Sequence, residues 1–270
     1  MPIKKDDSGK RWVEMEFLTP GTPEQVWQAM ATGPGNAAWF MRAEIEEREG
    51  GRFRFDFGQE VSTNGEVTLW QPPHRFGYVE RDWMENAPPV ATEISIVARS
   101  GGLCQVRMVH SLFASGDDWD DQLEGFESGW PCFFAALRLY LEYFPGLPGA
   151  GFMAMVPTTL STLESWRDLL SATGLDNPLV GEERAGPAGP ETLAGVIEKV
   201  VQEKGQRYLV LRLSEPGPGI MMCGVYQRSD HVSVSVVRFA YGNDAAERAA
   251  SLEGHWRDWM AQRFPAPAAT

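Results

Sequence analysis

The chain has 270 residues, of which 43% are hydrophobic, and a formal net charge of -13 at pH 7. This length allows one large domain or two of ordinary size, each with a packed core. So acidic a chain repels phosphate backbones and anionic lipid surfaces, which argues against nucleic acid and membranes as partners. The ten Trp and fourteen Phe residues can fill a core or line a cavity for an apolar molecule.

The cysteines and the N-terminus indicate where the protein resides. Cys104, Cys132 and Cys223 are far apart and form no CxxC pair, which is typical of buried thiols in a reducing compartment. The first residues, MPIKKDDSGKR, are not followed by the apolar stretch of a signal peptide. No apolar run approaches the roughly 18 residues that a membrane span needs. We expect a cytoplasmic protein.

The chain begins with a predicted strand and a predicted helix. Residues 11–18 alternate between apolar and polar, as a half-buried strand does. Thr22 is a good N-cap, Pro23 suits the first helical position and Gln25 completes a capping box. Trp27 lies on this helix, five residues after the cap.

An antiparallel meander and a long helix are predicted next. Turn residues separate strands near 43–48, 51–58, 63–71, 75–83, 90–99 and 103–112. A helical pattern opens at Asp117 and stops at Phe144, and its apolar residues share one stripe that can cover the sheet. Pro131 interrupts this stripe, so we expect a kink or a restart there, with space beneath the helix.

The same order of elements then repeats. A strand at 151–157 precedes a second capping box, formed by Ser161 and Glu164, with Trp166 again five residues after the cap. Strands follow near 194–203, 206–214, 219–228 and 231–240, and a helix runs from Asp244 to Phe264. Residues 178–193 are rich in Pro and Gly and stay unassigned. The linker PGLPGAG divides the chain into predicted domains 1–145 and 151–265.

Several motifs of the first domain carry a family resemblance. They are GGRFRF at 50–55, NGEVTLWQPPHRFGYVERDW at 64–83, TEISIVARSGG at 92–102, VRMVHSLF at 106–113 and ESGWPCFFAALRLYL at 127–141. Residues 11–144 thereby resemble the START-like superfamily, also called SRPBCC or Bet v 1-like, in the branch named after the activator of the Hsp90 ATPase. The resemblance implies a helix-grip fold, in which an antiparallel sheet wraps a long C-terminal helix around an apolar cavity.

The expected fold class is therefore α+β, with two tandem helix-grip units. The second unit shares the order of elements but few of the motifs, so we interpret it as a shorter, degenerate START-like domain. It has fewer large aromatic residues in its meander, and we expect it to be the poorer binder.

The stretch GGRFRFDFG places Phe53, Phe55 and Phe57 on one face of a strand. We expect this face to lie beneath the long helix, with Phe55 deepest and opposite Trp130 or Phe134. The predicted ligand-binding residues are Trp27, Trp39, Phe53, Phe55, Phe57, Tyr78, Met108, His110, Trp130 and Phe134. Ordinary core packing is the alternative for each of them.

His110 is the polar residue among these candidates. If Met108 points inward, His110 points inward with it, where it could orient a ligand, act as an acid or base, or form a hydrogen bond within the core. The acidic run that begins at Asp117 could recruit a basic partner or guard a cavity mouth, or it could simply stabilise the start of a helix. The four histidines lack metal-ligand spacing, so neither a metal nor a cofactor is predicted.

The sequence contains no recognisable catalytic constellation. The predicted function is the binding of an apolar or amphipathic small molecule in the first domain, without catalysis. One alternative, suggested by the family resemblance, is a co-chaperone-like module that contacts a chaperone or another protein. Another is a cyclase-like or hydrolase-like enzyme, which would need two or more polar side chains converging inside the cavity.

Overall fold

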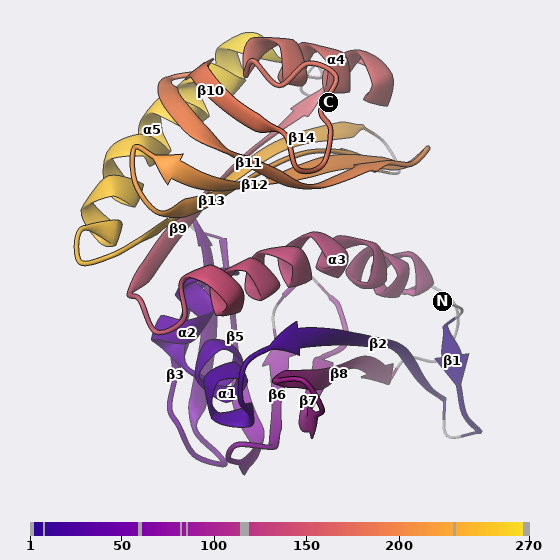
Figure 1. Cartoon of the computed structure of the whole chain (residues 1–270). Helices are drawn as coiled ribbons and strands as arrows, with labels where there is room; N and C mark the ends of the chain where they lie inside the picture. The colour runs from indigo at the N-terminus through magenta and orange to yellow at the C-terminus, as the bar shows by residue number, and fades with distance from the viewer. Residues whose placement is uncertain are drawn as a thin grey trace. The chain divides into compact units, whose positions relative to one another are not determined.

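The computed structural model describes residues 3–7, 9–58, 61–81, 83–84, 86–113, 119–228 and 231–266. The chain divides into two compact units, Met1–Gly146 and Leu147–Thr270. Each unit has an antiparallel sheet and a long C-terminal helix (Figure 1). This arrangement confirms the predicted α+β class.

The N-terminal unit is built on one twisted sheet whose order is β1-β2-β8-β7-β6-β5-β4-β3. Strands β3 to β8 form a meander, and β2 pairs beside the last of them. The elements are β1 (Lys4–Lys5), β2 (Lys10–Pro20), α1 (Pro23–Ala31), α2 (Gly33–Ala37), β3 (Arg42–Ile45), β4 (Arg52–Gly58), β5 (Val61–Gln71), β6 (Arg75–Arg81), β7 (Val90–Arg99), β8 (Leu103–Phe113) and α3 (Asp120–Tyr143).

The pairing of β2 with β8 defines the two faces of this sheet. Val13 lies opposite His110, and Trp12 lies opposite Ser111. Because successive side chains in a strand point to opposite faces, Val13 and His110 share the inner face, whereas Trp12 and Ser111 share the outer face. Helix α3 packs against β2 and β8, so it covers the inner face (Figure 1).

The local signals of the sequence are present in the structure. The Thr22 side chain accepts a hydrogen bond from the Gln25 backbone, and the Gln25 side chain accepts one from Thr22, which completes the predicted capping box of α1. Helix α3 continues through Pro131, so the helix does not restart there, and the expected alternative, a kink, stays a prediction. Ring contacts on either side of the proline hold the helix to the sheet. The predicted start at Asp117 lies outside the described residues.

The C-terminal unit has a sheet of order β10-β11-β12-β13-β14-β9. Its first strand again pairs beside its last. The elements are β9 (Gly149–Thr158), α4 (Thr162–Ala172), β10 (Glu183–Ala188), β11 (Glu191–Gln202), β12 (Gln206–Glu215), β13 (Gly219–Gln227), β14 (Val232–Tyr241) and α5 (Ala245–Arg263). Strand β10 falls in the stretch that the sequence left unassigned. The second predicted capping box, of Ser161 and Glu164, opens α4.

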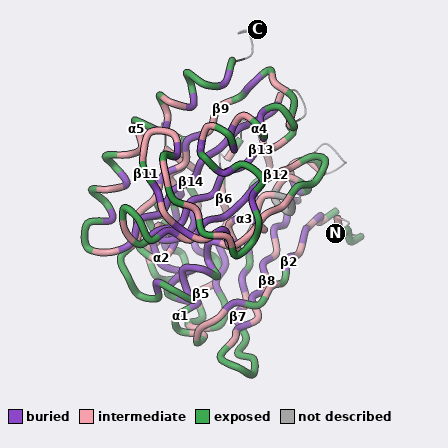
Figure 2. The backbone as a smooth tube through the Cα atoms, turned by 45° about the horizontal axis from the view of Figure 1, so that its top comes forward, coloured by how far each residue is buried: buried purple, intermediate pink, exposed green. Residues whose placement is uncertain are grey.

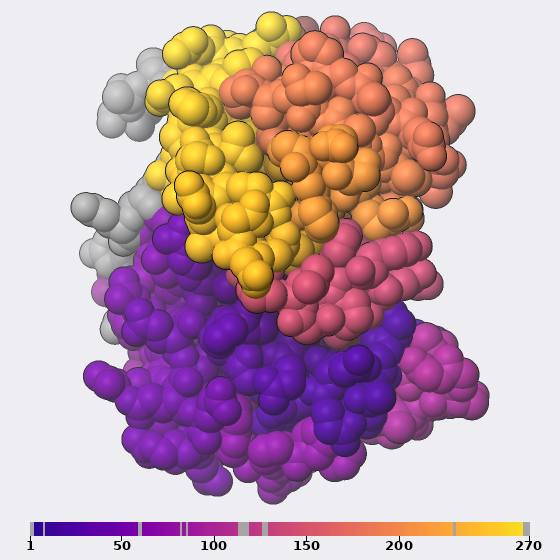
Figure 3. Space-filling model, turned by 60° about the vertical axis from the view of Figure 1, so that its left-hand side comes forward, coloured from indigo at the N-terminus to yellow at the C-terminus, as the bar shows by residue number. Residues whose placement is uncertain are grey.

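Helices α4 and α5 pack on the same face of the C-terminal sheet. Buried residues alternate with exposed ones along α5 (Figure 2), and the exposed side of the helix forms a ridge on the surface (Figure 3). Beneath α5, Arg238 and Glu191 form an ion pair whose side chains are 5% and 6% exposed, with 2.9 Å between Nε and Oε1. The Trp256 indole donates to the same Oε1 at 2.7 Å. This contact links β11, β14 and α5.

Strands β5 and β6 approach each other closely at Gly65. A Cβ atom at this position would lie 1.9 Å from the carbonyl oxygen of Val79, so Gly65→Ala must displace backbone. We expect the N-terminal unit to lose at least about 2 kcal/mol of unfolding free energy, measured by urea unfolding with amide NMR signals of each unit.

The matched control adds the same methyl group in an open place. Gly254 lies inside α5, and a Cβ atom there would meet nothing within 4 Å, so Gly254→Ala should stabilise the C-terminal unit by about 0.5–1 kcal/mol. Equal effects of the two substitutions would contradict the interpretation of Gly65.

Candidate functional site

The candidate site is an aromatic cluster on the inner face of the N-terminal sheet. In β4, Phe53 and Phe55 are 2% and 4% exposed, whereas Arg52 and Arg54 between and beside them face solvent. The Phe53 ring stacks on Tyr78 with 4.1 Å between centroids. The Phe55 ring meets Phe53 edge to face at 4.6 Å. The alternation of β4 therefore directs these rings inward.

Phe40 joins this cluster to helix α3. It follows α2, and its ring centroid lies 5.2 Å from that of Phe55 and 4.8 Å from that of Trp130. It also contacts Phe57 and Phe133. Phe55 therefore contacts Phe40, and Phe40 contacts the helix. Phe53, and not Phe55 as expected, is the slightly more buried of the two rings. The sequence did not indicate Phe40, because this residue lies in a turn, where no periodicity shows the direction of a side chain.

Trp130 and Phe134 of α3 form a ladder of parallel rings with the sheet. Trp130 stacks on His110 with 5.5 Å between centroids, and on Phe134 with 5.4 Å. Phe134 stacks on Phe17 of β2 at 4.0 Å. These contacts lie next to Pro131, and they attach both sides of it to β2 and β8.

The other candidates lie further along the same inner face. Trp27 of α1 contacts Phe76, which contacts Tyr78. Trp39 lies 6.2 Å from Trp130 between centroids, and Met108 is 1% exposed, two residues before His110 on β8. The structure thus brings the predicted residues together around one face, but their role as ligand contacts stays a prediction.

A row of polar side chains crosses this apolar face. Tyr78, Thr92 and His110 are register neighbours on β6, β7 and β8. The Thr92 hydroxyl and His110 Nδ1 are hydrogen-bonded at 2.8 Å. Burial lowers the pKa of His110 to about 3, so its imidazole is neutral near pH 7. Burial, together with the charge of Glu80, raises the pKa of Tyr78 well above its usual value, so its phenol is also neutral.

Glu80 adds a carboxyl group to the same face. It lies two residues after Tyr78 on β6, and Thr63 of β5 donates a hydrogen bond to its Oε2 at 2.8 Å. Burial raises the pKa of Glu80 from 4.5 to about 7. A carboxyl group with such a pKa can give or take a proton near neutral pH.

Thr63, Glu80 and Thr92 were missed in the sequence. The alternation of the strands nevertheless indicated them. Glu80 lies two residues after Tyr78 on β6, and Thr92 lies two residues from both Val90 and Ile94 on β7. An alternating strand places such residues on one face. Together the polar groups can bind a polar substituent of an otherwise apolar molecule.

An ion pair fixes the N-terminal end of α3 to the sheet. Arg11 of β2 is 5% exposed, and its Nε donates to Asp120 Oδ1 at 2.7 Å while its Nη2 contacts Oδ2. Asp120 belongs to the acidic run noted in the sequence. This contact assigns to Asp120 a structural role in holding the helix over the aromatic cluster.

One known protein family matches most of the N-terminal unit. Residues 20–142 match the family described as Activator of Hsp90 ATPase homolog 1-like protein. This match lies within the N-terminal unit and confirms the resemblance seen in the sequence. No curated protein matches the chain.

Several solved structures are similar to this chain. Protein MLL2253 from Mesorhizobium loti has 22% identity and a TM-score of 0.46, covering 50% of this chain and 98% of its own. CalU16 from Micromonospora echinospora has 18% identity and a TM-score of 0.42, covering 52% and 83%. DynU16, from the dynemicin biosynthetic locus, has 15% identity and a TM-score of 0.44, covering 93% and 95%.

Two kinds of feature are absent from the described residues. Among them, no helix is both long enough and apolar enough to cross a membrane. Within the same residues, no three His, Cys, Asp or Glu side chains are grouped so that they could hold a metal ion.

Glu80 gives the N-terminal unit a measurable pH dependence. Its folded-state pKa of about 7 lies above the ordinary value of 4.5, so the folded chain keeps a proton that the unfolded chain loses. This contribution therefore destabilises the fold as pH rises from 4.5 to 7, by about 3 kcal/mol in total. Glu80→Gln should remove this pH dependence. The unfolding free energy of the variant minus that of the unmodified protein should therefore rise by the same amount between pH 4.5 and 7.

The measurement is urea unfolding at a series of pH values between 4.5 and 7.5. Using the difference between the two proteins cancels the opposite contribution of His110, which destabilises the fold as pH falls below its ordinary value of 6.5. Glu66→Gln, on an exposed position of β5, serves as the control and should give a constant difference. A constant difference for Glu80→Gln would contradict the prediction.

Proposed function

We propose that the N-terminal unit binds an apolar or amphipathic small molecule among the rings beneath α3, without catalysis. The observation that carries this proposal is the row of Tyr78, Thr92 and His110, placed beside Trp130 on an otherwise aromatic face. A core that only had to be stable would bury apolar side chains there, because buried polar groups are costly. Few, well-placed polar groups in an apolar surrounding are what a binding site needs to orient a ligand.

The charge state of these groups favours a neutral ligand. The imidazole of His110 and the phenol of Tyr78 are uncharged near pH 7, and Glu80 is close to half protonated. An uncharged molecule with one hydroxyl or carbonyl group would be oriented by these groups, while its apolar part contacts Phe40, Phe53 and Phe55.

Phe55→Ala tests this proposal. If Phe55 borders a ligand site, its removal loses fewer packing contacts and costs about 1–3 kcal/mol. The affinity for the neutral dye N-phenyl-1-naphthylamine, measured by fluorescence titration, should change in the same variant.

Phe76→Ala is the matched control. Phe76 is 1% exposed and packs between Trp27, Trp70 and Tyr78, so its removal should cost about 3–5 kcal/mol. The folded fraction should bind the dye as before. If Phe55→Ala costs as much as Phe76→Ala and leaves dye binding unchanged, the rings are ordinary core.

Catalysis is the second candidate, and Glu80 favours it. A carboxyl with a pKa of about 7 beside Thr63 and Tyr78 is suited to general acid or base catalysis. Native mass spectrometry of the full chain and of Glu80→Gln, each purified from cells, distinguishes binding without catalysis from catalysis. The same co-purified molecule in both supports binding alone, whereas a different molecule in the variant supports an enzyme whose substrate accumulates. A co-purified protein in place of a small molecule would support the co-chaperone alternative.

We also infer that residues 151–265 form a second, shorter START-like domain. The order of a first strand, a capped helix, a meander that returns beside the first strand and a long helix supports this inference, since both units share it. The buried side chains of Cys104, Cys132 and Cys223 are thiols and are not joined in disulfides, which supports the proposed cytoplasmic location.

A further inference from the structure

The outer face of the N-terminal sheet, opposite the side that α3 covers, has a pocket of about 390 Å³. This volume is at the lower end of the range of ligand pockets. It is formed within one unit, by side chains and backbone of five strands, namely Lys10, Trp12 and Glu14 of β2, Thr68 and Leu69 of β5, Gly77 of β6, Ala91, Thr92 and Glu93 of β7, and Arg107, Val109 and Ser111 of β8.

Small residues between large ones produce this pocket. Ser111 lies opposite both Trp12 and Ala91 in the register, so the sheet beside the indole carries short side chains. Gly77 continues this floor, and a Cβ there would lie 3.1 Å from the Leu69 Cβ. The register of β5 against β6 shifts between Val67 and Leu69, and the two consecutive residues Thr68 and Leu69 both line the pocket.

The carboxylates around the pocket are already paired. Glu14 accepts hydrogen bonds from Lys4 at 2.8 Å and from Arg107 Nε at 2.6 Å, and these contacts lower its pKa to about 2. Glu93 accepts from Arg75 at 2.7 Å. A cationic ligand would have to displace one of these side chains, so the pocket disfavours cations.

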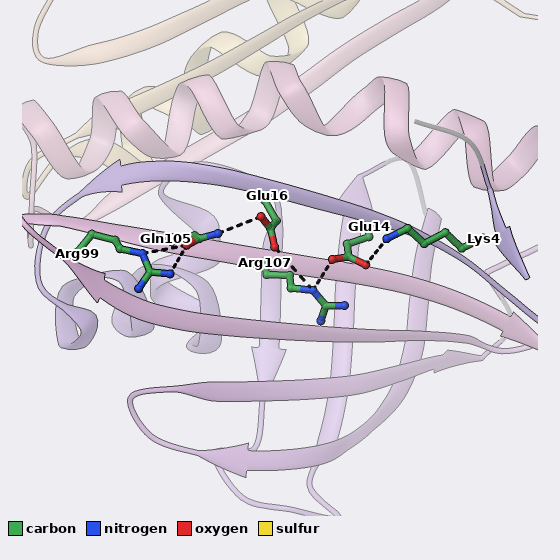
Figure 4. Close-up of polar contacts among 6 residues, drawn as sticks. All are labelled: Lys4, Glu14, Glu16, Arg99, Gln105 and Arg107. Atoms are coloured by element: carbon green, nitrogen blue, oxygen red, sulfur yellow. Dashed lines mark hydrogen bonds and ion pairs between the residues drawn. The ribbon is translucent and has the colours of Figure 1, made fainter. Parts of the chain in front are cut away.

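Arg107 is the group that can receive an anion. Its Nε faces Glu14 and lies 4.0 Å from Glu16, and the two terminal nitrogens point away from both carboxylates (Figure 4). The position of Glu16 is fixed in turn by Gln105, which Arg99 holds. The guanidinium is therefore oriented before any ligand arrives, and its outer edge matches the two oxygens of a carboxylate.

We propose that this outer pocket binds a small planar aromatic carboxylate, with its ring against Trp12 and its carboxylate on the terminal nitrogens of Arg107. The indole supplies a flat apolar wall, and the ammonium of Lys10, 5.9 Å from the centre of that indole, adds a second positive charge. Glu14, Glu16 and Glu93 all act electrostatically on the guanidinium, so a monoanion is preferred to a dianion such as phosphate. This proposal is independent of the ligand beneath α3.

The experiment is an NMR titration of the full-length protein with 2-naphthoate, with neutral 2-naphthamide and inorganic phosphate as comparison probes. We expect naphthoate to shift the indole signal of Trp12 and the amide signals of Gly77, Ala91 and Ser111. The amide probe and phosphate should each bind at least about tenfold more weakly, because neither combines a ring with a single negative charge.

Three variants test whether naphthoate binds in this pocket and not elsewhere on the protein. Ala91→Leu fills the pocket without changing any charge, and Arg107→Lys keeps the charge but loses the planar fork, so each should weaken naphthoate binding at least about tenfold. Val97→Leu enlarges an exposed residue on the same face of β7, 45% exposed and outside the pocket, and should leave binding unchanged. The spectra of the variants report directly on folding.

Three results would overturn the proposal. They are the absence of naphthoate binding at millimolar concentration, equal binding of naphthamide, and unchanged affinity in Ala91→Leu. Shifts confined to His110, Trp130 and their neighbours would place naphthoate beneath α3 and would also overturn it. Phe55→Ala should not alter binding at the outer pocket, so this result is separate from the dye experiment on the inner face.

Discussion

The pairing of β2 with β8 is the constraint on which the N-terminal unit depends. It runs without a shift from Lys10 opposite Phe113 to Pro20 opposite Leu103, and it joins segments that lie almost a hundred residues apart. Because side chains alternate between faces, a slip of one residue would exchange Trp12 with Val13 and move every neighbour on β2 to the wrong side. Helix α3 packs on this pair of strands, so the aromatic cluster and the outer pocket both follow from one register.

The two faces of this sheet have opposite chemistry. Beneath α3, polar groups are few and burial favours their neutral forms, because it lowers the pKa of His110 and raises those of Tyr78 and Glu80. On the outer face, charged side chains pair with each other where solvent lowers the cost of a charge. A neutral molecule suits the first face and an anion suits the second. The ligands that we propose for the two faces therefore belong to different chemical classes.

The C-terminal unit uses its buried polar groups differently. Glu191, Arg238 and Trp256 satisfy one another beneath α5, since both carboxylate oxygens of Glu191 accept hydrogen bonds from the other two side chains. Removing one member would leave a buried charge without its partner, which is strongly destabilising. These three side chains, which bond to one another, help to attach α5 to its sheet. The row of Tyr78, Thr92 and His110 beneath α3 instead has neutral polar groups that a ligand could use. The two units thus share the order of their elements but differ in the polar groups that they bury.

The sequence by itself determined the local structure. It indicated the strands, both capping boxes and the inward direction of Phe53, Tyr78 and His110, because these depend on neighbours within a few residues along the chain. It also carried the family resemblance of the N-terminal unit. Only the tertiary structure decided that Phe40 joins β4 to α3, that Thr92 meets His110 and Thr63 meets Glu80, and that small residues on β6, β7 and β8 leave a hollow beside Trp12. Those contacts require the register across several strands, and that register is set by pairing between distant segments, which no local pattern encodes.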